Sequence, residues 1–101
     1  MKMRERRYAL KQPNIDYMMN MTKKYLSGEM DVIDYGLDFA YELEKRYQKM
    51  HREDDDYCDL IYECLYEEGV ALFNELSDEE FKKLIRKQYN YIKKIAKEGF
   101  W

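Results

Sequence analysis

Residue types on which much enzyme chemistry depends are scarce in this sequence of 101 residues. It has one histidine, two cysteines, two serines, one proline and four isolated glycines. One histidine and two serines leave few candidates for a Ser–His–Asp site, and isolated glycines cannot form a phosphate-binding loop. The Glu-x-x-His pairs of di-metal bundles do not occur. We therefore expect no enzymatic activity, no cofactor and no metal site.

Long uncharged runs are also missing, which predicts neither a membrane span nor a signal peptide. Cys58 and Cys64 are six residues apart. On one helix their backbones would be about 9 Å apart, too far for a disulfide. We expect two reduced, packed thiols in a cytoplasmic protein. A zinc site formed by these cysteines and His51 has the wrong spacing and lacks a fourth ligand.

The formal net charge of −3 conceals an uneven distribution. Residues 1–12 carry a net charge of +4, residues 13–76 a net charge of −10, and residues 77–101 a net charge of +3. This length favours one domain, and 46 % hydrophobic residues exclude a disordered chain. We expect a basic N-terminal arm over 1–12 and a single helical domain over 13–101. Charge asymmetry of this kind bears on association rather than on the fold.

Helix formers dominate the sequence, and no segment alternates as a strand would. Apolar spacing and end signals predict helices over 13–27, 30–51 and 55–75, and a fourth from Ser77 to Gly99. Pro13 suits a first turn, Gly28 suits a C-terminal cap, and Ser77 with Glu80 forms a capping-box pattern. Four amphipathic helices with short connections favour an all-α fold, an antiparallel four-helix bundle.

Apolar residues on the second helix predict its buried face. Its central arc and the positions beside it comprise Val32, Ile33, Gly36, Leu37, Phe39, Ala40, Leu43, Tyr47 and Met50. Gly36 lies within that face and would permit a close helix crossing. In the third helix, Glu68 and Gly69 interrupt the pattern, so that a kink or break is expected there.

Two acidic rows with the same +3, +4, +4 spacing are the unusual feature of the sequence. The residues of these rows are Asp31, Asp34, Asp38 and Glu42 on the second helix, and Asp56, Asp59, Glu63 and Glu67 on the third. Tyr35 and Tyr41 flank the first row, and Tyr62 and Tyr66 lie beside the second. Like charges four residues apart destabilise a helix by a few tenths of a kcal/mol. Tyrosine beside charge is common at protein interfaces. We interpret the twelve residues as a partner-binding surface.

Such a surface should bind a basic partner, and paired carboxylate rows resemble the charge of a nucleic-acid backbone. A nuclease is therefore a natural target. Direct nucleic-acid binding would have to use Arg4, Arg6, Arg7 and the lysines of the last helix, which form no clean stripe. The acidic middle of the chain would repel phosphate, so we expect no direct contact with nucleic acid.

One segment resembles a known family. Residues 21–30, MTKKYLSGEM, followed by an acidic helix through Phe39 and Leu43 to Tyr47, are similar to the small helical immunity proteins of the colicin D type. That family includes immunity proteins that accompany contact-dependent growth inhibition toxins. Residues 59–76, leading into the helix that begins at Ser77, match its later half, so that the resemblance covers about residues 20–95.

The resemblance implies a cytoplasmic, non-enzymatic protein that binds a cognate toxin nuclease, often one that cleaves tRNA, and blocks its active site with acidic side chains. The eight carboxylates of the two rows would fill that role. The chain departs from the family in its basic N-terminal arm and lysine-rich last helix, which leaves the toxin class open. The alternative is a small regulatory or structural module that self-associates, whereas an inhibitor should be monomeric alone.

Overall fold

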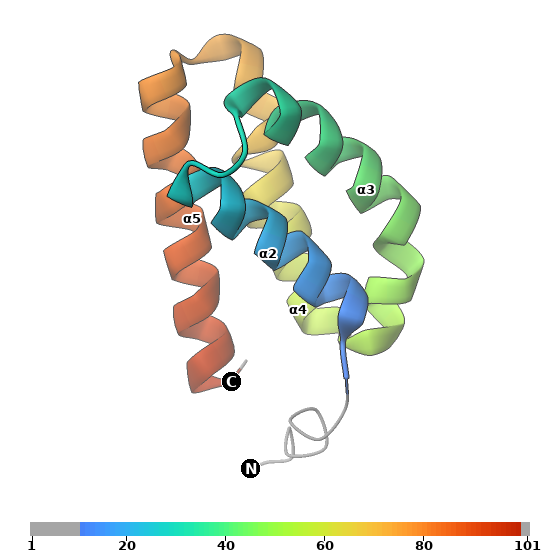
Figure 1. Ribbon diagram of the computed structural model, residues 1–101. Coiled ribbons are helices and arrows are strands. Elements are labelled where there is room, and N and C mark those ends of the chain that lie inside the picture. The colour runs from blue at the N-terminus through green and yellow to red at the C-terminus, as the bar shows by residue number, and fades with distance from the viewer. Residues whose placement is uncertain (1–10, 100–101) are drawn as a thin grey trace.

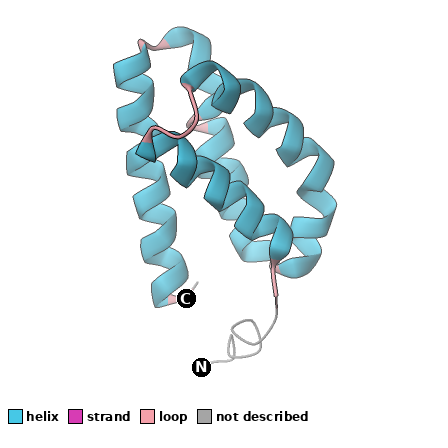
Figure 2. Cartoon of the chain, in the orientation of Figure 1, coloured by secondary structure: helices cyan, strands magenta, loops and turns pink. Residues whose placement is uncertain are grey.

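The computed structural model describes residues 11–99, and every regular element in that range is helical (Figures 1 and 2). Its four helices are α2 (Pro13–Ser27), α3 (Val32–Glu53), a composite third helix, and α5 (Asp78–Glu98). The third consists of α4 (Asp55–Leu60), the π-helix η1 (Ile61–Glu67) and the 3-10 helix η2 (Val70–Glu75). The all-helical prediction is confirmed. The basic N-terminal arm lies outside the described residues, apart from positions 11 and 12.

Helix α2 has the predicted bounds, and both of its ends are stabilised by hydrogen bonds. Gly28 takes a left-handed conformation (φ 90°), in which its N–H donates to the Tyr25 carbonyl and the next N–H donates to the Lys24 carbonyl. This is a Schellman cap. At the other end, the Glu53 carboxylate accepts from the backbone N–H groups of Asn14 and Ile15, at 3.1 and 3.0 Å. A residue 38 positions away thus supplies the N-terminal cap.

Helix α3 begins later and ends later than predicted. Asp31 is its N-cap, with a carboxylate that accepts from the Asp34 N–H at 2.8 Å, so this first member of the acidic row precedes the helix. The helix continues to Glu53, and Asp54 is both its C-cap and the N-cap of α4. The two helices therefore share one connecting residue, where the predicted bounds had left residues 52–54 between them.

The predicted helix over 55–75 is helical along most of its length, but the chain changes helix type twice within it. The α-helical hydrogen-bond pattern ends after Leu60, and the break falls at Glu68 and Gly69, where the sequence had indicated one. Gly69 is buried, and a Cβ there would lie 2.5 Å from the Leu65 carbonyl oxygen. Glycine is the residue that lets the backbone pass so close to the end of η1.

The predicted capping box starts α5. The Ser77 hydroxyl accepts from the Glu80 N–H, and the Glu80 carboxylate accepts from the Ser77 N–H, both at 3.1 Å. Phe81 then enters the core and is 1 % exposed. Further along α5, Tyr91 is 48 % exposed, whereas Tyr89 packs against the core.

The helices enclose one hydrophobic core. Helix α2 contacts α3 and α5, α3 contacts α4, and η1 contacts α5, so that the contacts form a closed ring. In Figure 1, α2 runs between α3 and α5. Gly36 is buried where η2 approaches α3, and a Cβ on it would meet the Phe73 ring at 3.0 Å, which confirms the predicted close approach. None of the described helices combines the length and apolar character that a bilayer crossing requires.

Candidate partner-binding surface

Half of the twelve predicted contact residues belong to α3 or its N-cap, and the inner side of this helix is buried. Phe39 and Leu43 pack in the core together with Tyr35, which is fully buried. The Tyr35 hydroxyl lies 2.8 Å from the Thr22 hydroxyl, and its ring stacks on Tyr25 with centroids 4.5 Å apart. The prediction that Tyr35 contacts a partner is therefore wrong. It occupies the helix position next to Asp34, but on the inner side of α3, where it joins α3 to α2.

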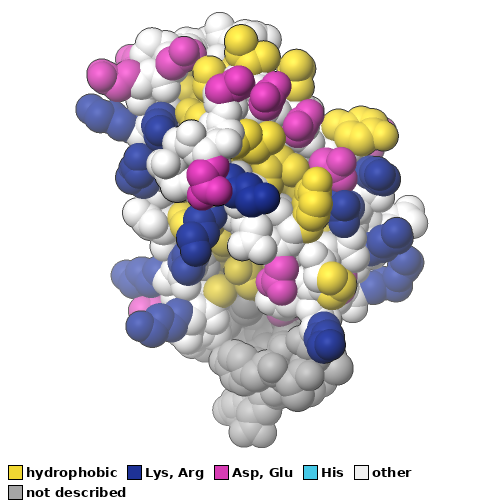
Figure 3. All heavy atoms as spheres, in the orientation of Figure 1, with side chains coloured by type: hydrophobic (Ala, Val, Ile, Leu, Met, Phe, Trp, Pro, Cys, Tyr) yellow, Lys and Arg dark blue, Asp and Glu magenta, His cyan; other side chains and the backbone are white. Residues whose placement is uncertain are grey.

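Three acidic residues on the solvent side of α3 form what we call the acidic flank: Asp31, Asp34 and Asp38. All three are exposed. Asp31 is engaged in capping the helix, whereas the carboxylates of Asp34 and Asp38 form no hydrogen bond or ion pair within residues 11–99. Figure 3 shows acidic side chains following α3 across the molecule. The flank thus presents unneutralised negative charge to solvent.

Glu42, the last member of the first row, is neutralised internally. Its carboxylate pairs with Arg46 at 2.9 Å, and Arg46 also donates to the Asn14 side chain and lies 3.7 Å from the centre of the Tyr17 ring. These contacts hold α3 against α2. The structure therefore assigns Glu42 to the α2–α3 contact and separates it from the two carboxylates without partners.

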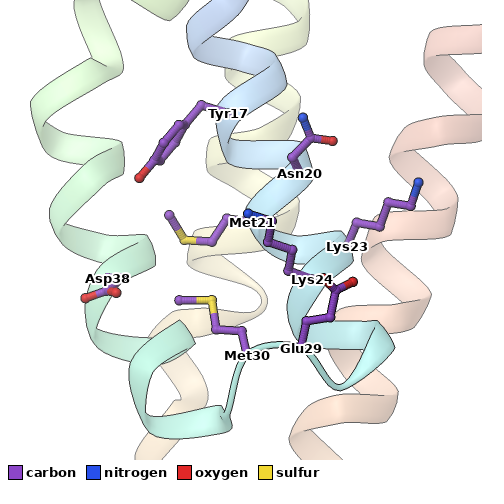
Figure 4. Close-up of a pocket in the computed structure, with 8 residues that line it drawn as sticks. All are labelled: Tyr17, Asn20, Met21, Lys23, Lys24, Glu29, Met30 and Asp38. Carbon is purple, nitrogen blue, oxygen red and sulfur yellow. The ribbon is translucent and has the colours of Figure 1, made fainter.

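Asp38 also borders an open groove of about 480 Å³ between α2 and α3 (Figure 4). Met21 extends into it from α2 and Met30 from the connection between α2 and α3, and Tyr17 lies at one end. Asn20, Lys23, Lys24 and Glu29 complete its lining. Both signs of charge occur around the groove, so it does not share the uniform charge of the acidic flank.

Beside the acidic flank, three large apolar side chains point to solvent. We call Ile33, Leu37 and Tyr41 the apolar stripe, and their exposed fractions are 60, 65 and 65 %. They repeat every four residues and form one row along α3. The expectation that Ile33 and Leu37 border the core is wrong, while Tyr41 is exposed as predicted. Lys45 at the end of the row lies 5.9 Å from the centre of the Tyr41 ring.

The second acidic row meets α3 on its other side. Asp59 accepts a hydrogen bond from the Tyr47 hydroxyl at 3.4 Å and lies 3.9 Å from His51. Tyr47 is nine residues from Asp38, about 180° around an α-helix at 100° per residue. The equal spacing of the two rows had suggested one continuous face. The rows instead lie on different sides of α3.

The tyrosines of η1 lie in a second open groove. Tyr62 and Tyr66 line it, opposite Ala40, Glu44 and Tyr47 of α3, and its volume is about 590 Å³. Glu63 and Glu67 are exposed beside them and form no ion pair with any residue that the structure describes. Asp56 is half-buried close to the N-terminus of α4.

The two cysteines and the three consecutive aspartates are side chains that could act as nucleophiles or metal ligands. Cys58 and Cys64 are buried and free, as predicted, and burial raises the pKa of the Cys58 thiol to about 12. Asp54, Asp55 and Asp56 bring carboxylate oxygens within 4.8 Å of one another. Asp54 caps α4 by accepting from the Tyr57 N–H, which accounts for its position.

The sequence did contain a signal for the apolar stripe. Taking Phe39 as the centre of the buried face, Leu37 and Tyr41 each lie about 160° away around the helix. The apolar character of Leu37 had favoured a position near the core, although its angle placed it on the opposite side of the helix.

Comparisons of the chain with protein-family models, with curated proteins and with solved structures found no match.

Proposed function

We propose that this protein is a non-enzymatic inhibitor of the immunity type, which binds a cognate bacterial toxin nuclease and covers its basic active site with the acidic flank of α3. It acts in the cytoplasm as an antiparallel four-helix bundle and is monomeric until it meets the toxin. The resemblance of residues 20–95 to colicin D-type immunity proteins supports this proposal, and it favours a toxin that cleaves tRNA.

The observation that carries the proposal is the state of Asp34 and Asp38. They lie one turn apart, both are exposed, and neither carboxylate has a partner within the described residues. A fold gains nothing from repeated like charge on one helix. An active site that holds phosphate oxygens is lined by cations, so two fixed carboxylates can occupy it as the substrate backbone would.

The test compares two double charge reversals that change the net charge equally. Asp34→Lys/Asp38→Lys alters the acidic flank, and Glu63→Lys/Glu67→Lys alters η1 as the matched control. RNA cleavage is measured with a basic nuclease domain recovered by pull-down with this chain from its native cell. We expect wild type and the η1 variant to inhibit cleavage and the flank variant to lose inhibition, with unchanged circular-dichroism melts. Equal inhibition by both variants would contradict the role of the flank.

A second function, self-association as a small structural module, is favoured by the apolar stripe. Exposed apolar rows of this kind occur at subunit interfaces. Sedimentation velocity separates the two functions. The inhibitor sediments as a monomer alone, and its affinity for the toxin falls as salt rises, because exposed charges are screened. The module sediments as a dimer or larger assembly that salt does not dissociate.

A further inference from the structure

We propose that the apolar stripe is the centre of the partner-binding surface, and that its occupant is a positively charged protein surface with an apolar middle. This inference deepens the proposed function and rests on it for the identity of the partner. It assigns the binding energy mainly to Ile33, Leu37 and Tyr41, and the choice of partner to the acidic flank.

The exposure of the stripe is the first argument. Leu37 and Tyr41 are each 65 % exposed, although the same helix buries Tyr35 and Phe39 completely. Single exposed apolar residues are ordinary on protein surfaces, but three in one row make a contiguous patch. Side chains that leave water completely at the middle of an interface carry most of its affinity, and tyrosine is prominent among them.

The charge beside the stripe identifies the kind of partner. Asp34 lies three residues before Leu37, and Asp38 lies three residues before Tyr41. Residues three apart are neighbours on a helix surface, so these two carboxylates run alongside the stripe. Any surface that covers Leu37 also comes within reach of both carboxylates. An acidic surface would place like charges together in a partly dry interface, which is costly. A surface with lysine or arginine around an apolar middle satisfies both features.

A second copy of this chain is the competing occupant. Lys45 and Lys49 follow the stripe along α3, so two antiparallel copies would also bring opposite charges together. In such a dimer, however, the interface would contain Asp34 and Asp38 from both copies, which is four carboxylates. Sedimentation velocity of the chain alone decides between these occupants. A monomer at micromolar concentration is expected, and a dimer that Leu37→Ser dissociates would overturn the proposal.

The binding test uses a defined probe, a short synthetic helical peptide with leucine on one face and lysine on the other. Its counterpart with glutamate in place of lysine tests the charge requirement. The variant Leu37→Ser/Tyr41→Ser removes the apolar stripe and keeps the acidic flank. Tyr91→Ser is the matched control, since Tyr91 is 48 % exposed on α5, away from the stripe. The three side chains changed in these variants are exposed and outside the core, so the melts should coincide.

We expect the lysine peptide to bind wild type and Tyr91→Ser equally, and the stripe variant about tenfold more weakly or worse. The glutamate peptide should not bind. Equal affinity of the stripe variant, or equal binding of the glutamate peptide, would overturn the inference.

The nuclease assay separates this inference from the proposed function. If the lysine peptide binds at the stripe but the nuclease domain is not inhibited, the inhibitor function fails and the surface assignment stands. If the nuclease domain is inhibited equally by wild type and by Leu37→Ser/Tyr41→Ser, the function stands and the stripe is not its centre.

Discussion

Replacing Thr22 with valine should show how strongly one buried hydrogen bond joins α2 to α3. Thr22 and Tyr35 are both fully buried, and their hydroxyl oxygens are 2.8 Å apart. The Thr22 hydroxyl donates to the Met18 carbonyl at 3.1 Å, and its single proton is used there. Tyr35 is therefore the donor between the two hydroxyls.

The magnitude follows from what valine leaves behind. Within residues 11–99 no buried side-chain nitrogen or oxygen lacks a hydrogen-bond partner, and Thr22→Val would create one, the Tyr35 hydroxyl. A buried polar group without a partner costs about 1–3 kcal/mol of unfolding free energy. For a domain of this size each kcal/mol lowers Tm by about 4–8 °C. Tyr35→Phe alone should cost about 1 kcal/mol, because Thr22 keeps its bond to Met18.

Urea denaturation followed by circular dichroism measures these differences, with an unchanged m-value showing that the unfolded state is unaffected. In the double variant Thr22→Val/Tyr35→Phe neither hydroxyl remains, so its loss should be smaller than the sum of the two single losses, by about 0.5 kcal/mol or more. Strict additivity would refute the reasoning. Tyr35→Phe should also leave partner affinity unchanged, because Tyr35 has no surface to offer.

Three further outcomes follow from the structure. Gly69→Ala should destabilise the chain by about 1–3 kcal/mol in the same urea assay, because its Cβ would lie 2.5 Å from the Leu65 carbonyl oxygen; a neutral result would contradict the close packing there. Ser77→Ala should cost about 1 kcal/mol through loss of the α5 cap. Backbone and side-chain hydrogen bonds to Ser77 lower the pKa of the Glu80 carboxyl group. The stability that Glu80 contributes is therefore present above about pH 4.5 and is lost as the pH falls through the lowered pKa. Cys58 should resist a thiol reagent at pH 8 and react only on unfolding, since burial raises its pKa to about 12; the stability from keeping this thiol neutral is present below about pH 9 and is lost above it.

The helix ends with strong local signals could be predicted from the sequence. Gly28 and the Ser77–Glu80 box act through neighbours within a few residues, so the sequence pattern contains the whole interaction. The Glu53 cap on α2 could not be found in this way, because its partners are 38 and 39 positions away. The change to a π-helix at Ile61 has no sequence signal that we can identify.

The predicted site shows the same limit. Spacing located Asp34 and Asp38 on an exposed side of α3 correctly, since a helix period is local. It could not show that Glu42 is neutralised by Arg46, which depends on how α2 and α3 meet. It also could not show that Asp59 faces Tyr47 on the other side of α3. Equal spacing of two rows describes each helix separately, whereas their relative position is set by packing.

The most direct test of the inhibitor function is RNA cleavage by a basic nuclease domain recovered with this chain from its native cell, measured with increasing amounts of the wild-type chain. An inhibitor that occupies the active site predicts that cleavage stops at equimolar chain and returns as salt is raised, because the carboxylates of the acidic flank are exposed and screened. Full cleavage in the presence of a large excess of the chain at low salt would contradict the account.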